Sequence, residues 1–277
     1  MNLVVLAGDV DSAALKNIAK LTEAREVEQI TTRSFRLVGA KPHEGLVAAC
    51  AEGGLDHVWL PEGRKLGDFG LFVTDMDSTL INIECIDEIA DMQGLKHEVA
   101  TITEAAMQGE IDFRESLTRR VALLAGLPET ALAEVFDHRL QLNAGAERLL
   151  QGLQRAGIRT VLVSGGFTYF TERLKARLGF DHAYANELEI IDGKLTGKVV
   201  GDIIDGEAKA AHLERVRDEL GLKPEQVIAA GDGANDIPML RAAGFGVAFR
   251  AKPVLRDVAH CCLDHTGLDG ILDIFGG

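Results

Sequence analysis

Three uninterrupted apolar segments constrain the fold of this chain more than any other feature. Each of them stops at polar residues: segment 69–74 at Asp75, segment 160–163 at Ser164, and segment 227–230 at Gly231 and Asp232. A strand that is buried on both faces has this continuous apolar pattern. Because a helical pattern follows each segment, we expect an α/β fold with a doubly wound parallel sheet.

The polar residues at the ends of these segments indicate where a functional site lies. Ligands of doubly wound sheets bind beyond the carboxyl ends of the strands. Asp75, Ser164 and Asp232 all stand at that edge. We therefore expect these three positions to converge on one crevice.

Two further features divide the chain. The polar stretch 61–68 contains two glycines and a proline and is typical of a linker. It separates a small α/β accessory module of unknown role, residues 1–66, from a main domain, residues 67–277. Within the main domain, the pattern of about 85–140 is helical throughout, which predicts an inserted helical cap that could act as a lid. The Asp-Gly pair within 186–201 predicts a β-hairpin.

Composition excludes several classes of partner. The 277 residues include 29 basic and 43 acidic side chains, for a net charge of −14, and this balance argues against nucleic-acid binding. No segment approaches the roughly 18 apolar residues of a membrane span. The cysteines at 50, 85, 261 and 262 form no C-x-x-C pair, so we expect reduced thiols and a cytoplasmic location.

Asp75 and Asp77 are the first candidates for chemistry. Two carboxylates at the end of a buried strand repel each other and are costly to bury unless a cation compensates them. Oxygen ligands favour a hard cation such as Mg²⁺. The alternative role is structural, because Asp77 or Ser78 could cap a following helix.

Further candidates follow the later strands. The turn at 231–236 adds the carboxylates of Asp232 and Asp236, although a glycine-rich acidic turn is common without any ligand. The segment Ser164-Gly165-Gly166 offers a hydroxyl and open N–H groups to an anion. Lys209 could neutralise a phosphate, while an exposed helix lysine is its commoner role. Four acids at two neighbouring strand ends favour a shared cation.

The ordered set of motifs resembles the haloacid dehalogenase superfamily of phosphohydrolases over about residues 69–277. The resemblance rests on D-x-D-x-T at 75–79, Ser164, Lys209 and G-D-G-A-N-D at 231–236. The chain is most similar to members that act on O-phosphoserine, because Glu84 completes the pattern D-x-D-S-T-x-x-x-x-E and residues 116–121 read S-L-T-R-R-V. The family's arginine matches Arg120, with Arg119 beside it. Met107 and Phe113 also match cap positions.

The resemblance implies hydrolysis of O-phospho-L-serine to L-serine and phosphate, the last step of serine biosynthesis, through an aspartyl phosphate. Asp75 would be the nucleophile and Asp77 the general acid and base. One Mg²⁺ would be held by Asp75, the main-chain carbonyl of Asp77, Asp232 and, through water, Asp236. The implied substrate contacts are Ser164, Gly165, Lys209 and Asn235 for the phosphoryl group, and Glu84, Arg120, Met107 and Phe113 for the rest of the molecule.

Other interpretations stay open at this point. A phosphatase or phosphotransferase of the same superfamily could act on phosphothreonine or a phosphosugar. A non-catalytic module could bind a metabolite and Mg²⁺, although it would have no need of an acid beside a nucleophile. A dinucleotide-binding protein is disfavoured, because Asp232 stands where a pyrophosphate would need room. The oligomeric state, a homodimer included, and the preference for L- or D-substrate are not determined by the sequence.

Overall fold

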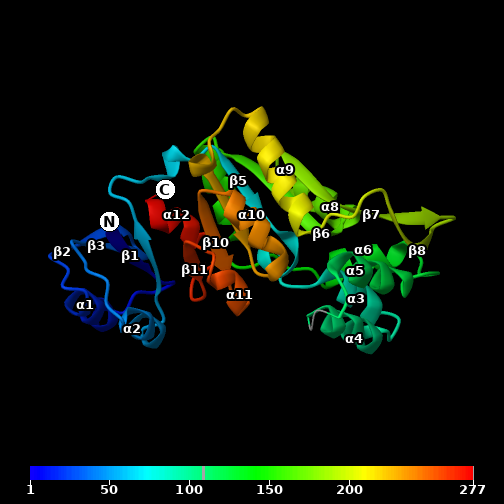
Figure 1. Ribbon diagram of the computed structural model, residues 1–277, viewed down its shortest axis with the longest axis horizontal. Helices are drawn as coiled ribbons and strands as arrows, with labels where there is room; N and C mark the ends of the chain where they lie inside the picture. The colour runs from blue at the N-terminus through cyan, green and yellow to red at the C-terminus, as the bar shows by residue number, and fades with distance from the viewer. Residues whose placement is uncertain (108–109, 277) are drawn as a thin grey trace.

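The computed structural model describes residues 1–107 and 110–276 (Figure 1). Its strands are β1 (Asn2–Leu6), β2 (Glu26–Thr31), β3 (Ser34–Val38), β4 (Asp56–Leu60), β5 (Leu71–Thr74), β6 (Arg159–Phe167), β7 (His182–Ile191), β8 (Lys194–Val200), β9 (Val227–Gly231), β10 (Phe245–Phe249) and β11 (Cys261–Leu263). Its helices are α1 (Ser12–Leu21), α2 (Leu46–Glu52), α3 (Cys85–Asp91), α4 (Lys96–Met107), α5 (Phe113–Ala122), α6 (Thr130–His138), α7 (Ala146–Arg155), α8 (Thr168–Leu178), α9 (Gly206–Glu219), α10 (Ile237–Ala242), α11 (Pro253–Arg256) and α12 (Gly270–Phe275).

The strands form one mixed sheet in the order β2-β3-β1-β4-β11-β10-β9-β5-β6-β7-β8. The central strands from β11 to β7 are parallel, which confirms the predicted parallel sheet at the place where the functional residues lie. Both ends of the sheet are antiparallel: one end is formed by the N-terminal strands and the other by the predicted β-hairpin. Short connections such as the two-residue turn between β7 and β8 permit only antiparallel pairing.

The central strands are apolar because helices cover both of their faces. Leu71 and Val73 of β5 join the core under α9 and α10, whereas Phe72, which lies between them, joins the core under α7, α8 and α12. Successive side chains of a strand point to opposite faces. An uninterrupted apolar run is therefore the pattern that this position requires.

The N-terminal part of the chain continues the same sheet. Strand β4 pairs with β11 at His57 and Cys262, and the Asp56 carboxylate accepts hydrogen bonds from the main-chain N–H groups of residues 264–266. One face of β1 packs under α1 and α2, while Val4 and Leu6 belong to the main core. In Figure 1 this blue part lies beside the red helix α12. The proposed boundary between residues 66 and 67 falls in the connection from β4 to β5.

Helices α3 to α6 form the inserted cap that the sequence predicts, and they lie beside the β7–β8 hairpin (Figure 1). The two segments that enter and leave the cap pair at Ile81 and Leu142. The predicted hairpin turn is confirmed, because Asp192 and Gly193 both have positive φ angles, 51° and 72°. None of the helices in the described ranges is long and apolar enough to cross a membrane.

Candidate active site

The three sequence-predicted clusters meet at one edge of the sheet. Asp75 directly follows β5, Ser164 lies near the end of β6, and Asp232 directly follows β9. Strand β5 pairs with β6 on one side and with β9 on the other, both in parallel. Parallel pairing brings the carboxyl ends of neighbouring strands together, which is why residues far apart in the chain form one site.

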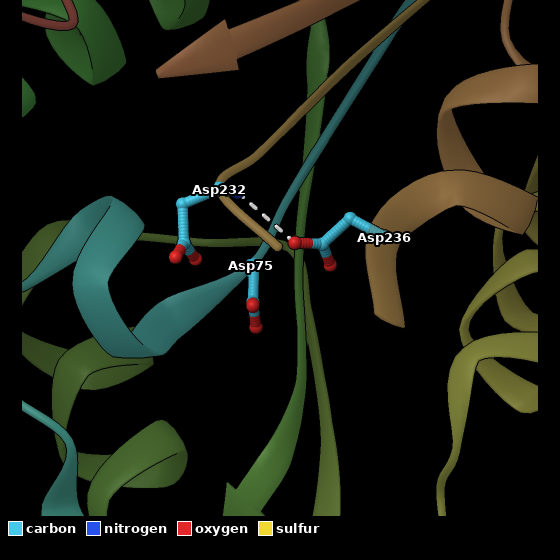
Figure 2. A group of neighbouring side chains, drawn as sticks. All are labelled: Asp75, Asp232 and Asp236. Carbon is cyan, nitrogen blue, oxygen red and sulfur yellow. Dashed lines mark hydrogen bonds between the residues drawn. The ribbon is translucent and has the colours of Figure 1, made fainter. Parts of the chain in front are cut away.

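Asp75, Asp232 and Asp236 form a compact group of carboxylates (Figure 2), with one ligand oxygen of each within 4.8 Å of the others. The Nζ atom of Lys209 lies 2.8 Å from Asp75 Oδ1 and 2.8 Å from Asp236 Oδ1. Three carboxylates and one ammonium leave two negative charges uncompensated. A set of oxygen ligands with this charge fits a hard divalent cation such as Mg²⁺.

Hydrogen bonds hold the carboxylates of Asp232 and Asp236 in place. Thr79 Oγ1 donates to Asp232 Oδ1 over 3.2 Å, and Asp236 Oδ2 accepts from the N–H groups of Asp232 and Gly233. The glycine at 231 is required here, because a Cβ atom at that position would lie 2.4 Å from Asp236 Cγ. The glycine-rich turn after β9 is therefore a support for the carboxylates and not a plain connection.

The pKa values of these groups reflect the crowding of charge. Burial, followed by repulsion from Asp236, raises the pKa of Asp75 well above its usual value. Burial and Asp236 also raise the pKa of Asp232, to about 6. Burial alone would lower the pKa of Lys209, but Asp236 and Asp75 outweigh it and raise that pKa. Lys209 is 1% exposed, which excludes the alternative of a surface helix lysine.

Asp77 is not a member of the carboxylate group formed by Asp75, Asp232 and Asp236. Its Oδ1 accepts the N–H of Cys85, the first residue of α3, over 2.9 Å, but the N-cap of that helix is Glu84 and not Asp77. Its Oδ2 accepts from Ser164 Oγ over 3.3 Å. Burial, followed by the negative charge of Glu84, raises the pKa of Asp77 to about 7. A carboxyl group with this pKa can both donate and accept a proton near neutral pH.

The segment after Val163 lets the chain approach the site closely. A Cβ atom at Gly166 would lie 2.6 Å from Asp77 Oδ2, and one at Gly165 would lie 2.9 Å from Cζ of Phe113 in the cap. Ser164 is buried, and its Oγ accepts the N–H of Gly166 over 2.8 Å. Phe113 therefore lies directly over the expected anion-binding segment.

Sequence reasoning missed Asn186, a buried residue of β7. Its Nδ2 donates to the carbonyl of Gly165 over 2.8 Å, and its Oδ1 accepts the N–H of Ile204 over 2.8 Å. No local signal marks it, because the strand also carries His182, Glu187 and Glu189, and only the fold shows which polar side chain is buried and needs partners. Asn186 fixes the backbone of the expected anion-binding segment.

The hinge of the cap contains a second amide that the sequence did not single out. Asn143 Nδ2 donates to the carbonyl groups of Thr79 and Ile81 over 2.8 and 3.0 Å. This amide links the segment that leaves the cap to the turn after Asp75.

The structure distinguishes between the two adjacent arginines of α5. Arg119 is exposed and pairs with Glu115 on its own helix. Arg120 is half-buried; burial lowers the pKa of Arg120, and the negative charges of Asp87, Glu84 and Asp77 oppose the shift. Arg120 is therefore the arginine that faces the site.

The remaining predicted residues differ in position. Glu84 is exposed at the start of α3, and its Oε1 accepts from Ser78 Oγ over 2.6 Å. Asn235 is half-buried in the turn that carries Asp236. The side chain of Met107 lies outside the described residues.

Known proteins are similar to this chain in sequence and in fold. The family model of haloacid dehalogenase-like hydrolases matches residues 72–241, and a domain of unknown function matches residues 3–46. A phosphoserine phosphatase of Polaromonas sp. (strain JS666) is 54% identical over 215 residues, which cover 76% of this chain and 91% of that protein.

Solved structures resemble the chain over different lengths. A probable phosphoserine phosphatase from Vibrio cholerae, in an unliganded form, has a TM-score of 0.87 at 35% identity and covers 99% of this chain and 86% of its own. A phospho-aspartyl intermediate analogue of phosphoserine phosphatase has a TM-score of 0.70 at 41% identity and covers 75% of this chain and 99% of its own. The chain therefore belongs to the haloacid dehalogenase-like hydrolases, and within that family it groups with the phosphoserine phosphatases.

Proposed function

We propose that this protein hydrolyses O-phospho-L-serine to L-serine and phosphate in two displacement steps. The observation that carries the proposal is the ion pair between the buried Lys209 ammonium and Asp75, two residues before Asp77, a carboxyl group with a pKa of about 7. A nucleophile beside a cation and a proton donor is the combination that phosphoryl transfer requires.

In the first step, a carboxylate oxygen of Asp75 attacks phosphorus, and the bond from phosphorus to the serine oxygen breaks. Asp77 donates its proton to that oxygen, so serine leaves as a neutral alcohol. In the second step, Asp77 takes a proton from water, the water oxygen attacks phosphorus, and the Asp75 carboxylate is released. One residue can serve both steps because the first step leaves Asp77 deprotonated and the second step returns a proton to it.

The group of carboxylates would hold Mg²⁺ through Asp75 and Asp232, together with the main-chain carbonyl of Asp77, and Asp236 would act through water. When bound, the ion would screen the phosphoryl charge from the attacking carboxylate and stabilise charge that develops in the transition state. Lys209, Ser164 and the N–H of Gly165 would hold the phosphoryl oxygens, and Asn235 would complete this set. The charge of Lys209 would also oppose the raised pKa of Asp75 and so favour its ionised form.

The cap would select the serine part of the substrate. Glu84 would bind the ammonium group and Arg120 the carboxylate, which matches the charges of an amino acid. Phe113 would close the site over these groups. The half-buried position of Arg120 supports this role, because a less hydrated guanidinium binds a carboxylate more strongly.

The proposed reaction places the protein at the last step of serine biosynthesis, with a small molecule as its substrate. We propose the cytoplasm as its location. The four cysteines support this proposal because all of them are free thiols.

The test is phosphate release from O-phospho-L-serine with and without Mg²⁺, compared with O-phosphothreonine and a phosphosugar. We expect release that needs Mg²⁺, favours phosphoserine and is lost in Asp75→Asn, while Asp68→Asn, which alters a carboxylate outside the site, retains activity. Turnover of a phosphosugar in preference to phosphoserine would contradict the substrate. Full activity of Asp75→Asn would contradict the mechanism.

A further inference from the structure

We propose that Arg114 is a positioning residue that fastens the N-terminal end of α5 to the core and so holds Phe113 over the site. The proposal rests on the proposed phosphatase function. Arg114 Nε lies 2.7 Å from Asp205 Oδ2, and its Nη2 donates to the carbonyl of Ile203 over 3.3 Å. The guanidinium therefore forms hydrogen bonds with one carboxylate and one carbonyl of the segment that precedes α9.

Both ends of this contact lead directly to the site. On the cap side, Arg114 follows Phe113, whose ring lies against Gly165. On the core side, Asp205 caps α9, because its Oδ1 accepts the N–H of Ala208, and its carbonyl accepts the N–H of Lys209. The ion pair thus joins the residue that covers the phosphoryl site to the helix that carries Lys209.

The rest of the cap is attached elsewhere. The hinge lies at Ile81 and Leu142, and the loop that follows α5 forms main-chain hydrogen bonds with strand β8, such as Gly126 N–H to the carbonyl of Leu195. These contacts hold the C-terminal end of α5. Among the described residues, the polar contacts from the N-terminal end of α5 to the core are those of Arg114.

The exposure of the pair suits a contact that breaks and re-forms. The Arg114 side chain is 52% exposed and that of Asp205 is 20% exposed. Exposed ion pairs are weak, so losing one changes a local equilibrium by about 1.5-fold to fivefold. A contact of this strength favours the closed position of Phe113 and still permits substrate to enter and product to leave.

Loss of the Arg114 contact should weaken substrate binding more than it slows the chemical steps. Without Arg114, Phe113 spends more time away from Gly165, and bound phosphoserine dissociates more readily. Asp75, Asp77 and Lys209 keep their positions, because the contact lies outside the carboxylate group. We therefore expect KM to rise while kcat is retained.

The experiment compares Arg114→Gln, Arg114→Lys and the matched control Arg119→Gln. Arg119 is 54% exposed on the same helix, but its partner Glu115 lies within α5, so its loss removes no contact with the core. In Arg114→Gln we expect KM for phosphoserine to rise by about twofold to fivefold, with kcat unchanged within about twofold. Arg114→Lys should restore most of the wild-type KM, and Arg119→Gln should leave it unchanged.

Hydrogen–deuterium exchange gives a second measurement that needs no turnover. Amides of residues 113–118 should exchange faster in Arg114→Gln than in Arg119→Gln, whereas those of 130–138 should not change. Equal KM values and equal exchange in the two glutamine variants would overturn the role of Arg114. Wild-type protein without activity on phosphoserine would instead contradict the proposed function, and the exchange comparison would still test the contact.

Discussion

Lys209→Met tests the charge balance of the site directly. Methionine fills a similar volume in a position that is 1% exposed, but it removes the ammonium that lies 2.8 Å from both Asp75 and Asp236. Removal of one partner of a buried ion pair costs about 3 to 5 kcal/mol. We expect a loss of that size in the free energy of unfolding, measured without Mg²⁺ at about pH 8.

The size of this loss should depend on pH. Lys209 lowers the pKa of Asp75, which burial and neighbouring acids already raise. Without the lysine that pKa moves further above its unfolded value, so the folded state binds more protons than the unfolded state. Stability then falls as pH rises through the folded pKa. The deficit of the variant should therefore be smaller near pH 5.5 than near pH 8.

Urea denaturation followed by circular dichroism, with EDTA or with Mg²⁺, measures both effects. A divalent ion that binds the folded carboxylates should restore part of the lost stability. The control is Lys175→Met, a surface lysine 4.0 Å from Glu172, which should cost less than about 1 kcal/mol. A Lys209→Met deficit below about 1 kcal/mol, or one that is equal at both pH values, would refute the reasoning.

Further outcomes are expected at three other places. Arg120→Ala should raise KM for phosphoserine by more than tenfold, as about 1.4 kcal/mol of lost binding requires, and Arg119→Ala should not; equal effects would contradict the assignment of Arg120. Gly231→Ala should cost about 1 to 3 kcal/mol in urea denaturation, because its Cβ would lie 2.4 Å from a buried carboxyl carbon, whereas Gly67→Ala has no atom within 4 Å of its Cβ and should be nearly neutral. Burial alone would raise the pKa of Asp269, but hydrogen bonds from two arginines outweigh it and hold that pKa below its usual value. The Asp269 carboxylate therefore stabilises the fold above its unfolded pKa of about 3.9. This stabilisation is lost as pH falls through the lower folded pKa. Asp269→Asn should accordingly show a smaller loss of stability between about pH 5 and pH 3 than the wild type.

The sequence by itself determined the elements whose signals are local. Segment 69–74 is apolar without interruption, so it had to be a strand with both faces covered, and Asp75 had to follow it at the carboxyl edge. The Asp192-Gly193 pair determined the hairpin turn, because the turn needs positive φ angles at two successive residues and few residue pairs adopt them. The helical period of 85–140 likewise determined an insertion without strands among its described residues.

Only the tertiary structure decided which charges meet. Arg119 and Arg120 are neighbours in sequence, and their difference appears only when α5 packs with one of them toward Glu84 and Asp87. The burial of Lys209 likewise depends on carboxylates that follow two distant strands. Local periodicity specifies a helix but leaves undetermined which distant groups face it.

The pairing of His57 with Cys262 joins the N-terminal strands to the main sheet, and no local pattern in either strand specifies its partner. Edge strands form hydrogen bonds with any chain of suitable shape, so burial and packing between distant segments select the pair that forms. Propensity and spacing therefore determined the strands and the acidic motifs, while the contacts between remote segments decided the continuous sheet and the faces of the cap.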